Sequence, residues 1–385
     1  MRNVSVLVLF VGFAALSFPF GQCLAGSSSL DREVNAPHQQ PYRLLWRQQL
    51  MRTGFHRDIG LAFGEPEFVR GKNLVVVAAP NGRVQALRAQ TGKLMWELDL
   101  GVELSGIVKH AKDNERELLL VADRLGYLHG LSLTGQEVLW RVKIGAAITN
   151  LWPESQTTTY LTTDDHRFIA VSTANGLQLW EHKRSGVPVM TIRGAGRPLV
   201  EGDRVYLGFA DGHVAALNKS SGKVIWTRDL SVGMSGRFRD SDFAPLRAPC
   251  GILFANYQAG LFCLEREHGG VEFRVNAKGI TYFESTPQTL IAGTHEGKVF
   301  AISWETRKKK YYSDLRIGPV LGSNETGLSD TAVLAAANSL TLIRRETGRP
   351  IQAFKLPGEI LNSPVVSGDF IGLIDSGGEL LVFSR

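Results

Sequence analysis

A short phrase recurs along the chain: a turn ending in glycine, an alternating strand, a Thr-Gly or Ser-Gly turn, and then a tryptophan. It is clearest at residues 81–87 followed by 91–96, and again at 211–217 followed by 221–226. Units of this length cannot bury a core alone and must stack on their neighbours. The phrase therefore predicts a repeat architecture, and it assigns every other residue a position within the repeat.

The copies align on the residue that begins the third strand of each unit. Successive positions lie 37–48 residues apart, which is the range of four-stranded propeller blades. Within a unit, runs rich in β-branched and aromatic residues are separated by turn signals such as Asp211-Gly212. There are eight copies, aligned on Gly82, Gly126, His166, Gly212, Gly260, Gly297, Asn338 and Gly378.

Aromatic residues mark the fourth strand of the units. Once the third copy is aligned on His166, the tryptophans of the first four copies fall in register, and the last three complete copies offer other aromatic residues nearby. Because an indole is a large apolar surface with one polar group, we expect it to stack where blades meet. The residues are Trp96, Trp140, Trp180, Trp226, Phe273, Tyr311 and Phe354.

The two ends of the repeat complement each other. The last copy stops after residues 379–383, one strand short of a blade, whereas residues 42–50 form a tryptophan strand with no blade before it. Pairing the two closes the ring and removes the exposed edges of an open sheet. We therefore predict an all-β fold, an eight-bladed β-propeller of four-stranded antiparallel blades, in which an N-terminal strand completes the last blade.

The first residues have the pattern of a secretion signal. Arg2 precedes an apolar stretch over 4–18, Pro19 breaks that stretch, and a cleavage site of small residues follows at Ala25. The alternative is an uncleaved membrane anchor, for which the apolar stretch is short. We predict a signal peptide over 1–25, a flexible tether over 26–41 and the propeller over 42–385, with export as the consequence.

Three cysteines bear on anchoring and redox state. Cys23 is a candidate for lipidation, but Gln22 and Phe20 make a poor lipobox, and the question stays open. Cleavage after residue 25 leaves Cys250 and Cys263. If the hairpin turn lies at residues 258–259, Cys263 faces Phe254, so a disulfide would need a different register. We expect two free thiols.

The net charge of +6 raises the question of nucleic acid. The basic residues are scattered, and the one run, residues 307–310, falls in a predicted turn between strands. No basic groove interleaved with aromatic residues is present in the pattern. We therefore expect no nucleic-acid partner, and we interpret the run as a solvated loop tip.

Residues 89–96 resemble the blade signature of pyrroloquinoline-quinone-dependent dehydrogenases. Those enzymes hold the quinone over a vicinal cysteine pair and use acidic residues for calcium and for a catalytic base, whereas this sequence has no adjacent cysteines. It also has no Gly-x-Ser-x-Gly, His-Glu-x-x-His or Cys-x-x-Cys motif. We predict a protein that is not an enzyme, with no cofactor and no small-molecule substrate; the alternative is a quinone-dependent oxidoreductase or a degenerate quinone binder.

The repeat is interrupted after Trp180 and after Trp226. Arg193 lies 13 residues beyond the first tryptophan, and Asp240 and Asp242 lie 14 and 16 residues beyond the second. Equivalent connections of successive blades emerge side by side on one face, so these charges form a patch with apolar neighbours. That chemistry is typical of protein-docking sites, and the alternative is a salt bridge that only ties two loops together. The candidate contact residues are Met190, Ile192, Arg193, Asp240 and Asp242.

The stretch Arg-Gly-x-x-x-Pro at residues 193–198, one blade before Arg-x-x-Asp-x-Asp-x-x-Pro at 237–245, resembles the BamB family, the propeller subunit of the outer-membrane β-barrel assembly machinery. The resemblance covers the whole mature chain. It departs from the family at the weak lipobox of Cys23 and at Gly196-Arg197, where the family has a small residue before the proline.

This resemblance implies a function. A BamB-like chain is a non-catalytic periplasmic scaffold at the inner face of the outer membrane. It docks through these two loops on the POTRA domains of the central subunit, BamA, and assists the assembly and insertion of outer-membrane proteins. The exposed edges of the blades make unfolded outer-membrane proteins candidate partners through β-augmentation.

Overall fold

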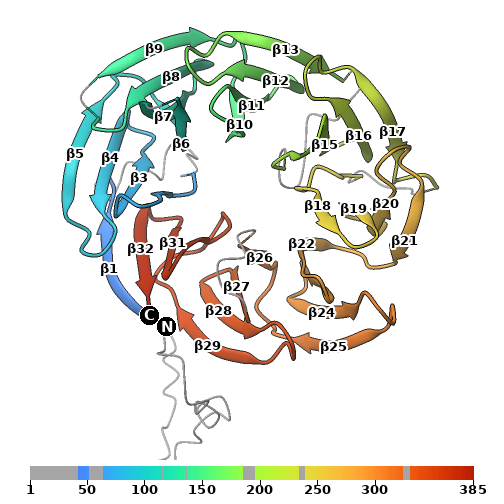
Figure 1. The fold of residues 1–385 in the computed structure, drawn as a ribbon. Helices are drawn as coiled ribbons and strands as arrows, with labels where there is room; N and C mark the ends of the chain where they lie inside the picture. Colours follow the sequence, from blue (N-terminus) through green and yellow to red (C-terminus); the bar gives the residue numbers. More distant parts are fainter. Residues whose placement is uncertain are drawn as a thin grey trace, which may run out of the picture. The chain divides into compact units, whose positions relative to one another are not determined.

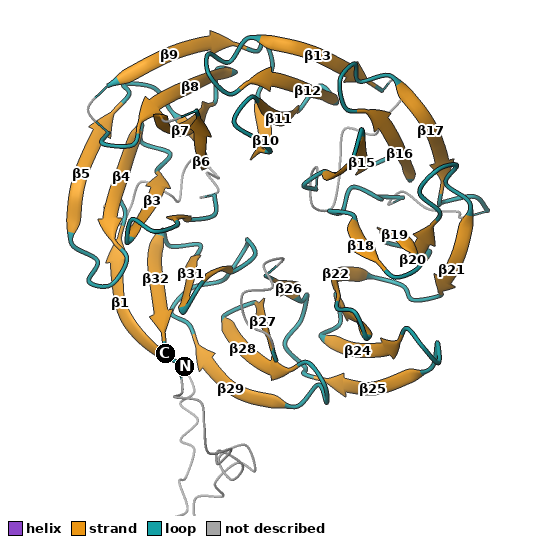
Figure 2. Cartoon of the chain, in the orientation of Figure 1, coloured by secondary structure: helices purple, strands orange, loops and turns teal. Residues whose placement is uncertain are grey.

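A computed structural model of the chain describes residues 42–51, 64–114, 116–135, 137–184, 196–233, 239–323 and 330–385. The chain divides into two units, Met1–Gln39 and Gln40–Arg385, and all described residues lie in the second. Every regular element in this part is a strand (Figure 2). Among the described residues, no helix has the length and apolar character needed to cross a membrane.

The described strands form eight four-stranded antiparallel sheets (Figure 1), which confirms the predicted fold. From inner to outer strand, blades 1 to 4 are β2 (Glu67–Val69), β3 (Leu74–Ala78), β4 (Arg83–Arg88) and β5 (Leu94–Asp99); β6 (Leu104–Asp113), β7 (Arg116–Asp123), β8 (Tyr127–Ser132) and β9 (Val138–Lys143); β10 (Ile148–Pro153), β11 (Thr158–Thr163), β12 (Arg167–Ser172) and β13 (Gln178–Lys183); β14 (Leu199–Glu201), β15 (Arg204–Gly208), β16 (His213–Asn218) and β17 (Val224–Asp229).

Blades 5 to 8 have the same order, and the strand that opens the described chain is the outer strand of the eighth. They are β18 (Leu246–Ala248), β19 (Gly251–Asn256), β20 (Gly260–Leu264) and β21 (Val271–Val275); β22 (Ile280–Ser285), β23 (Thr289–Thr294), β24 (Lys298–Ser303) and β25 (Lys309–Asp314); β26 (Leu321–Gly322), β27 (Thr331–Ala336), β28 (Ser339–Arg344) and β29 (Pro350–Lys355); β30 (Val365–Ser367), β31 (Phe370–Ile374), β32 (Glu379–Ser384) and β1 (Arg43–Gln49).

Strand exchange closes the ring, as predicted. β1 pairs antiparallel with β32, so the blue start of the propeller lies against its red end in Figure 1. The Gln352 side chain of blade 7 accepts a hydrogen bond from the Tyr42 amide (3.0 Å) and donates one to the Tyr42 carbonyl (2.7 Å). The closing strand is therefore held by its own blade and by the preceding one.

The hydrophobic core lies between the blades, in clusters that each combine side chains from two neighbours. In one such cluster, Trp180 and Phe168 of blade 3 meet Leu207 and Leu217 of blade 4. The same pattern continues around the ring, through the cluster that joins blade 8 to blade 1. Since a blade buries its two faces only against two neighbours, its folding depends on the ring.

The recurring glycine and tryptophan contact each other across blades. A Cβ placed on Gly222 of blade 4 would lie 2.4 Å from the Trp180 ring of blade 3, and the Trp180 indole donates to the Lys219 carbonyl in the same turn (2.9 Å). Gly222 also has a φ of 66°, in the left-handed region. Glycine satisfies both requirements at once, which explains why the phrase keeps the two residues together.

Blades 5 to 7 have another residue at the position of the tryptophan. Phe273 and Tyr311 pair with Cys263 and Ala301, which is the position that Trp226 holds opposite Ala216 in blade 4. In blade 7 the corresponding residue is Gln352, next to the irregularity where β29 has one residue more than β28. Phe354 lies two residues further on and packs against Phe383, with ring centroids 4.8 Å apart.

The expectation of two free thiols is wrong. Cys250 and Cys263 form a disulfide, with Cα atoms 6.1 Å apart. Two details of the register account for the difference: Cys263 pairs with Leu253 instead of Phe254, and Cys250 lies in the turn before β19. The turn brings Cys250 back beside β20, a path that counting residues along two paired strands does not reveal.

Candidate functional site

The candidate contact residues divide between two interblade connections. Met190, Ile192 and Arg193 belong to the connection between β13 and β14 and lie outside the described residues. Asp240 and Asp242 belong to the connection between β17 and β18, and the structure describes both. The two connections leave successive blades, 3 and 4, at the same end.

Both aspartates are buried. Only 1% of Asp240 and 3% of Asp242 is exposed, and Ser241 between them is fully covered. This differs from the sequence-based picture of an exposed charged patch. Because a buried carboxylate is costly unless it is paired, the burial indicates that these two groups fix the shape of the connection.

The connection around Ser241 is fastened to both blades that it joins. The Ser241 amide donates to the Phe209 carbonyl of blade 4 (2.9 Å), and the Tyr257 amide of blade 5 donates to the Asp240 carbonyl (2.9 Å). The Asn256 side chain donates to the Ser241 hydroxyl (2.9 Å). A Cβ on Gly208 would lie 1.6 Å from the Ser241 carbonyl oxygen, so only glycine admits this close approach.

The two connections meet, as their equivalent positions predict. The Gly196 amide donates to the Asp242 carbonyl (2.5 Å), and a Cβ on Gly196 would lie 2.3 Å from the Ala244 amide nitrogen. At the other end of the first connection, Arg184 forms an ion pair with Asp211 of blade 4 (2.5 Å). Blade 4 and the connection that follows it thus contact the described residues on both sides of 185–195.

The described surface beside these connections is basic and apolar. Arg197 and Arg239 are exposed, one in each connection, and Val232 exposes 74% of its surface. The sequence analysis did not propose these three residues as contact residues, and it named Arg197 only as a departure from the family pattern. Their position in the two interrupting connections is the sequence feature that could have pointed to them.

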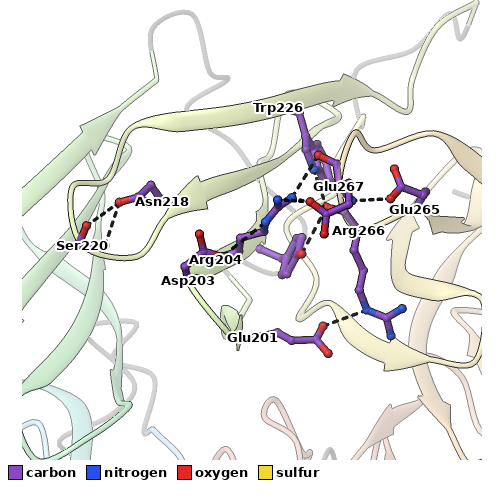
Figure 3. Close-up of polar contacts among 10 residues, drawn as sticks. Glu201, Asp203, Arg204, Asn218, Ser220, Trp226, Glu265, Arg266 and Glu267 are labelled. Carbon is purple, nitrogen blue, oxygen red and sulfur yellow. Dashed lines mark hydrogen bonds and ion pairs between the residues drawn. The ribbon is translucent and has the colours of Figure 1, made fainter.

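A polar cluster locks blade 4 to blade 5, the blades joined by the second connection (Figure 3). The Arg266 carbonyl of blade 5 accepts hydrogen bonds from Trp226 (3.0 Å) and Arg204 (2.8 Å) of blade 4. The Glu201 carboxylate lies within ion-pair distance of Arg266 (3.2 Å) and Arg247 (3.0 Å). These contacts keep the two blades at a fixed mutual angle.

The inner strands surround a channel of about 1130 Å³, which Arg197 and Asp242 also line. Lys109 is one of the ionisable groups in its lining, and its ammonium lies 3.4 Å from Glu67 and 3.6 Å from Glu65. Burial disfavours its ammonium, but the two carboxylates outweigh burial and raise the pKa of Lys109. A lysine that stays protonated at neutral pH cannot serve as a general base.

Histidines and acidic groups provide little else that is chemically reactive in the described part of the chain. His129 and Asp123 form a close pair (2.9 Å) but expose only 3% and 0% of their surface, so no substrate can reach them. The pKa of His110 is lowered, mainly by burial, which leaves its ring neutral. No group of three or more His, Cys, Asp or Glu side chains among the described residues could hold a metal ion.

Comparison with known proteins identifies the family. The family model described as "Outer membrane protein assembly factor BamB" matches residues 80–311, more than half of the chain. This chain belongs to the BamB family. The relatives named outer membrane protein assembly factor BamB include those of Shewanella oneidensis, 21% identical over 69% of each chain, and Burkholderia pseudomallei, 23% identical over 80% of this chain and 81% of the relative.

Among solved structures, BamB from Moraxella catarrhalis superposes with a TM-score of 0.73 at 17% identity. The match covers 90% of this chain and all of that one. At this identity the likeness establishes the shared eight-bladed fold. The family assignment agrees with the resemblance that the two connections carry.

Proposed function

We propose that this BamB-family chain is a non-catalytic scaffold that assists the assembly and insertion of outer-membrane proteins. It docks through the connections of blades 3 and 4 on the POTRA domains of a BamA-like barrel-assembly subunit. One observation carries this proposal: the connections that bear the family's motif residues meet at Gly196 and Asp242 and are fastened to the blades around them.

Preorganisation supports a docking role. The buried aspartates and the Ser241 hydrogen bonds hold the second connection before any partner arrives, so little conformational entropy is lost on binding. Within this proposal Asp240 and Asp242 shape the interface, and Met190, Ile192 and Arg193 contact the partner. An arginine with apolar neighbours is typical of binding hot spots.

The proposed location is the periplasm, at the inner face of the outer membrane. The disulfide between Cys250 and Cys263 supports this location, because disulfides persist in oxidising compartments such as the bacterial periplasm. The pattern of a secretion signal in the first residues agrees with it. Unfolded outer-membrane proteins are the proposed clients of the assembled machinery.

Substitution of Arg193 tests the docking surface. Arg193→Glu should abolish capture of purified POTRA domains, because it reverses the one charge proposed to contact the partner directly. Lys223→Glu is the matched control: it reverses an exposed cation on the turn between β16 and β17, at the other end of blade 4. It should leave capture intact.

Both variants should unfold at nearly the wild-type temperature, which separates docking from folding. Unaltered capture by a folded Arg193→Glu protein would contradict the proposal. So would saturable binding of pyrroloquinoline quinone with calcium, accompanied by turnover of an electron-accepting dye, because these would indicate the oxidoreductase alternative.

A further inference from the structure

Four consecutive cations, Arg307 to Lys310, lie at the end of the turn between the third and fourth strands of blade 6 and at the start of β25. All four side chains are exposed. Elsewhere, many basic side chains have a carboxylate nearby, as Lys298 has Glu296 in the same blade. Among the described residues, no carboxylate forms an ion pair with any of the four. Their charge is therefore available to an external partner.

Arg307 stands where the equivalent turns between the third and fourth strands of other blades have glycine. The equivalent residues Gly92, Gly222 and Gly348 have φ between 66° and 69°, and Arg307 has a φ of 55°. A residue with a Cβ adopts this left-handed conformation at a cost. Backbone strain that occurs in one copy of a repeat indicates a possible function. Here the strained residue carries a guanidinium, whereas the equivalent glycines have no side chain.

Aromatic rings support the cations. The Arg307 guanidinium lies 5.5 Å from the centroid of the Phe273 ring. In the other blades, a larger aromatic ring packs against the glycine that stands at the position of Arg307. The Lys309 ammonium lies 5.5 Å from the centroid of the Tyr312 ring, and Tyr312 exposes 51% of its surface. Cations next to an exposed tyrosine are suited to a boundary between water and lipid.

The position of this turn leaves it accessible in the proposed complex. Successive strands reverse direction, so turns between third and fourth strands lie at the opposite end of the blades from the connections that lead to the next blade. The equivalent turn of blade 7 adds two exposed cations, Arg344 and Arg349. Exposed cations at the end of a blade can contact a flat anionic surface.

We propose that residues 307–310 bind the anionic phospholipid headgroups of a bilayer surface. Each lysine or arginine near such a surface adds to the attraction, and several together are needed for measurable binding. This inference goes beyond the docking function and does not depend on it, because the two surfaces lie at opposite ends of the blades.

Vesicle sedimentation tests the proposal. The full chain, carrying Cys23→Ser so that no lipid on that residue contributes, should sediment with vesicles of phosphatidylglycerol and phosphatidylethanolamine and should not sediment with phosphatidylcholine alone. Lys308→Gln with Lys309→Gln should weaken binding about 30-fold. Added salt should weaken the remaining attraction further.

Two controls separate the turn from net charge and from folding. Lys93→Gln with Lys223→Gln removes the same charge at the residues that follow Gly92 and Gly222, and it should leave vesicle binding unchanged. Arg307→Gly should weaken binding about fivefold without lowering the unfolding temperature, because it removes one cation and relieves the backbone.

Three results would overturn the proposal. The first is equal sedimentation of the protein with both kinds of vesicle, and the second is that Lys93→Gln with Lys223→Gln weakens vesicle binding as much as Lys308→Gln with Lys309→Gln does. The third is that the protein with Lys308→Gln and Lys309→Gln keeps its vesicle binding and loses binding to polyglutamate. The last result would point to an acidic polypeptide instead. POTRA capture should be the same for all these variants, so failure of this inference is distinguishable from failure of the docking proposal.

Discussion

At the scale of single residues, the sequence predicts where a residue lies in the repeat better than it predicts whether that residue is buried. The alignment placed His166 where six other copies have glycine, and the backbone of His166 has a φ of 64°, in the left-handed region that those glycines also adopt. The same alignment placed Asp240 and Asp242 in the right connection but could not show that both are buried. Gly208 and Asn256 of other strands contact Ser241 between the two aspartates, and the spacing of residues along the chain does not predict such contacts.

The glycine of the recurring phrase is open to a direct stability test. Gly222→Ala should destabilise the protein through two effects: about 1 kcal/mol for a Cβ at positive φ, and about 1–3 kcal/mol for overpacking against Trp180. Gly202→Ala is the matched control, since Gly202 also has a positive φ but nothing within 4 Å of its Cβ position. Denaturant unfolding measures both, and equal losses would refute the packing explanation.

At the scale of elements, strand order and register follow from the repeat, whereas contacts between turns do not. Residues 42–50 could be assigned to the last blade because one blade lacked a strand. The disulfide could not be foreseen, because Cys250 lies in the turn before β19 and reaches Cys263 outside the strand register. The sequence also did not predict that Gln352 stands where an aromatic residue was expected. Its side chain forms hydrogen bonds with the backbone of Tyr42, immediately before the closing strand.

One buried ion pair joins two blades. Arg345 of blade 7 contacts both carboxylate oxygens of Glu284 of blade 6, at 2.8 and 2.9 Å, and both residues are buried. Arg345→Met should cost about 3–5 kcal/mol, because it leaves a buried carboxylate uncompensated. Adding Glu284→Leu should recover a large part of that loss in chemical denaturation. A double variant no more stable than the single one would show that the pair is not the cause.

At the scale of the whole molecule, the two proposed binding surfaces lie at opposite ends of the ring. One end presents the connections of blades 3 and 4, and the opposite end presents the basic turn of blade 6. The interblade clusters and the closing strand keep these surfaces at fixed positions within the propeller. If both proposals hold, a ring of this kind can contact a docked partner and a bilayer surface without a conformational change of its own.

Site-specific photo-crosslinking in living cells tests the central claim most directly. A photoreactive amino acid at Arg197 or Arg239, an exposed arginine in each of the two connections, should form a covalent adduct with the BamA-like subunit. The same probe at Lys223, which is exposed at the other end of blade 4, should form none. An adduct at Lys223 with none at Arg197 or Arg239 would place the docking surface elsewhere and contradict the account.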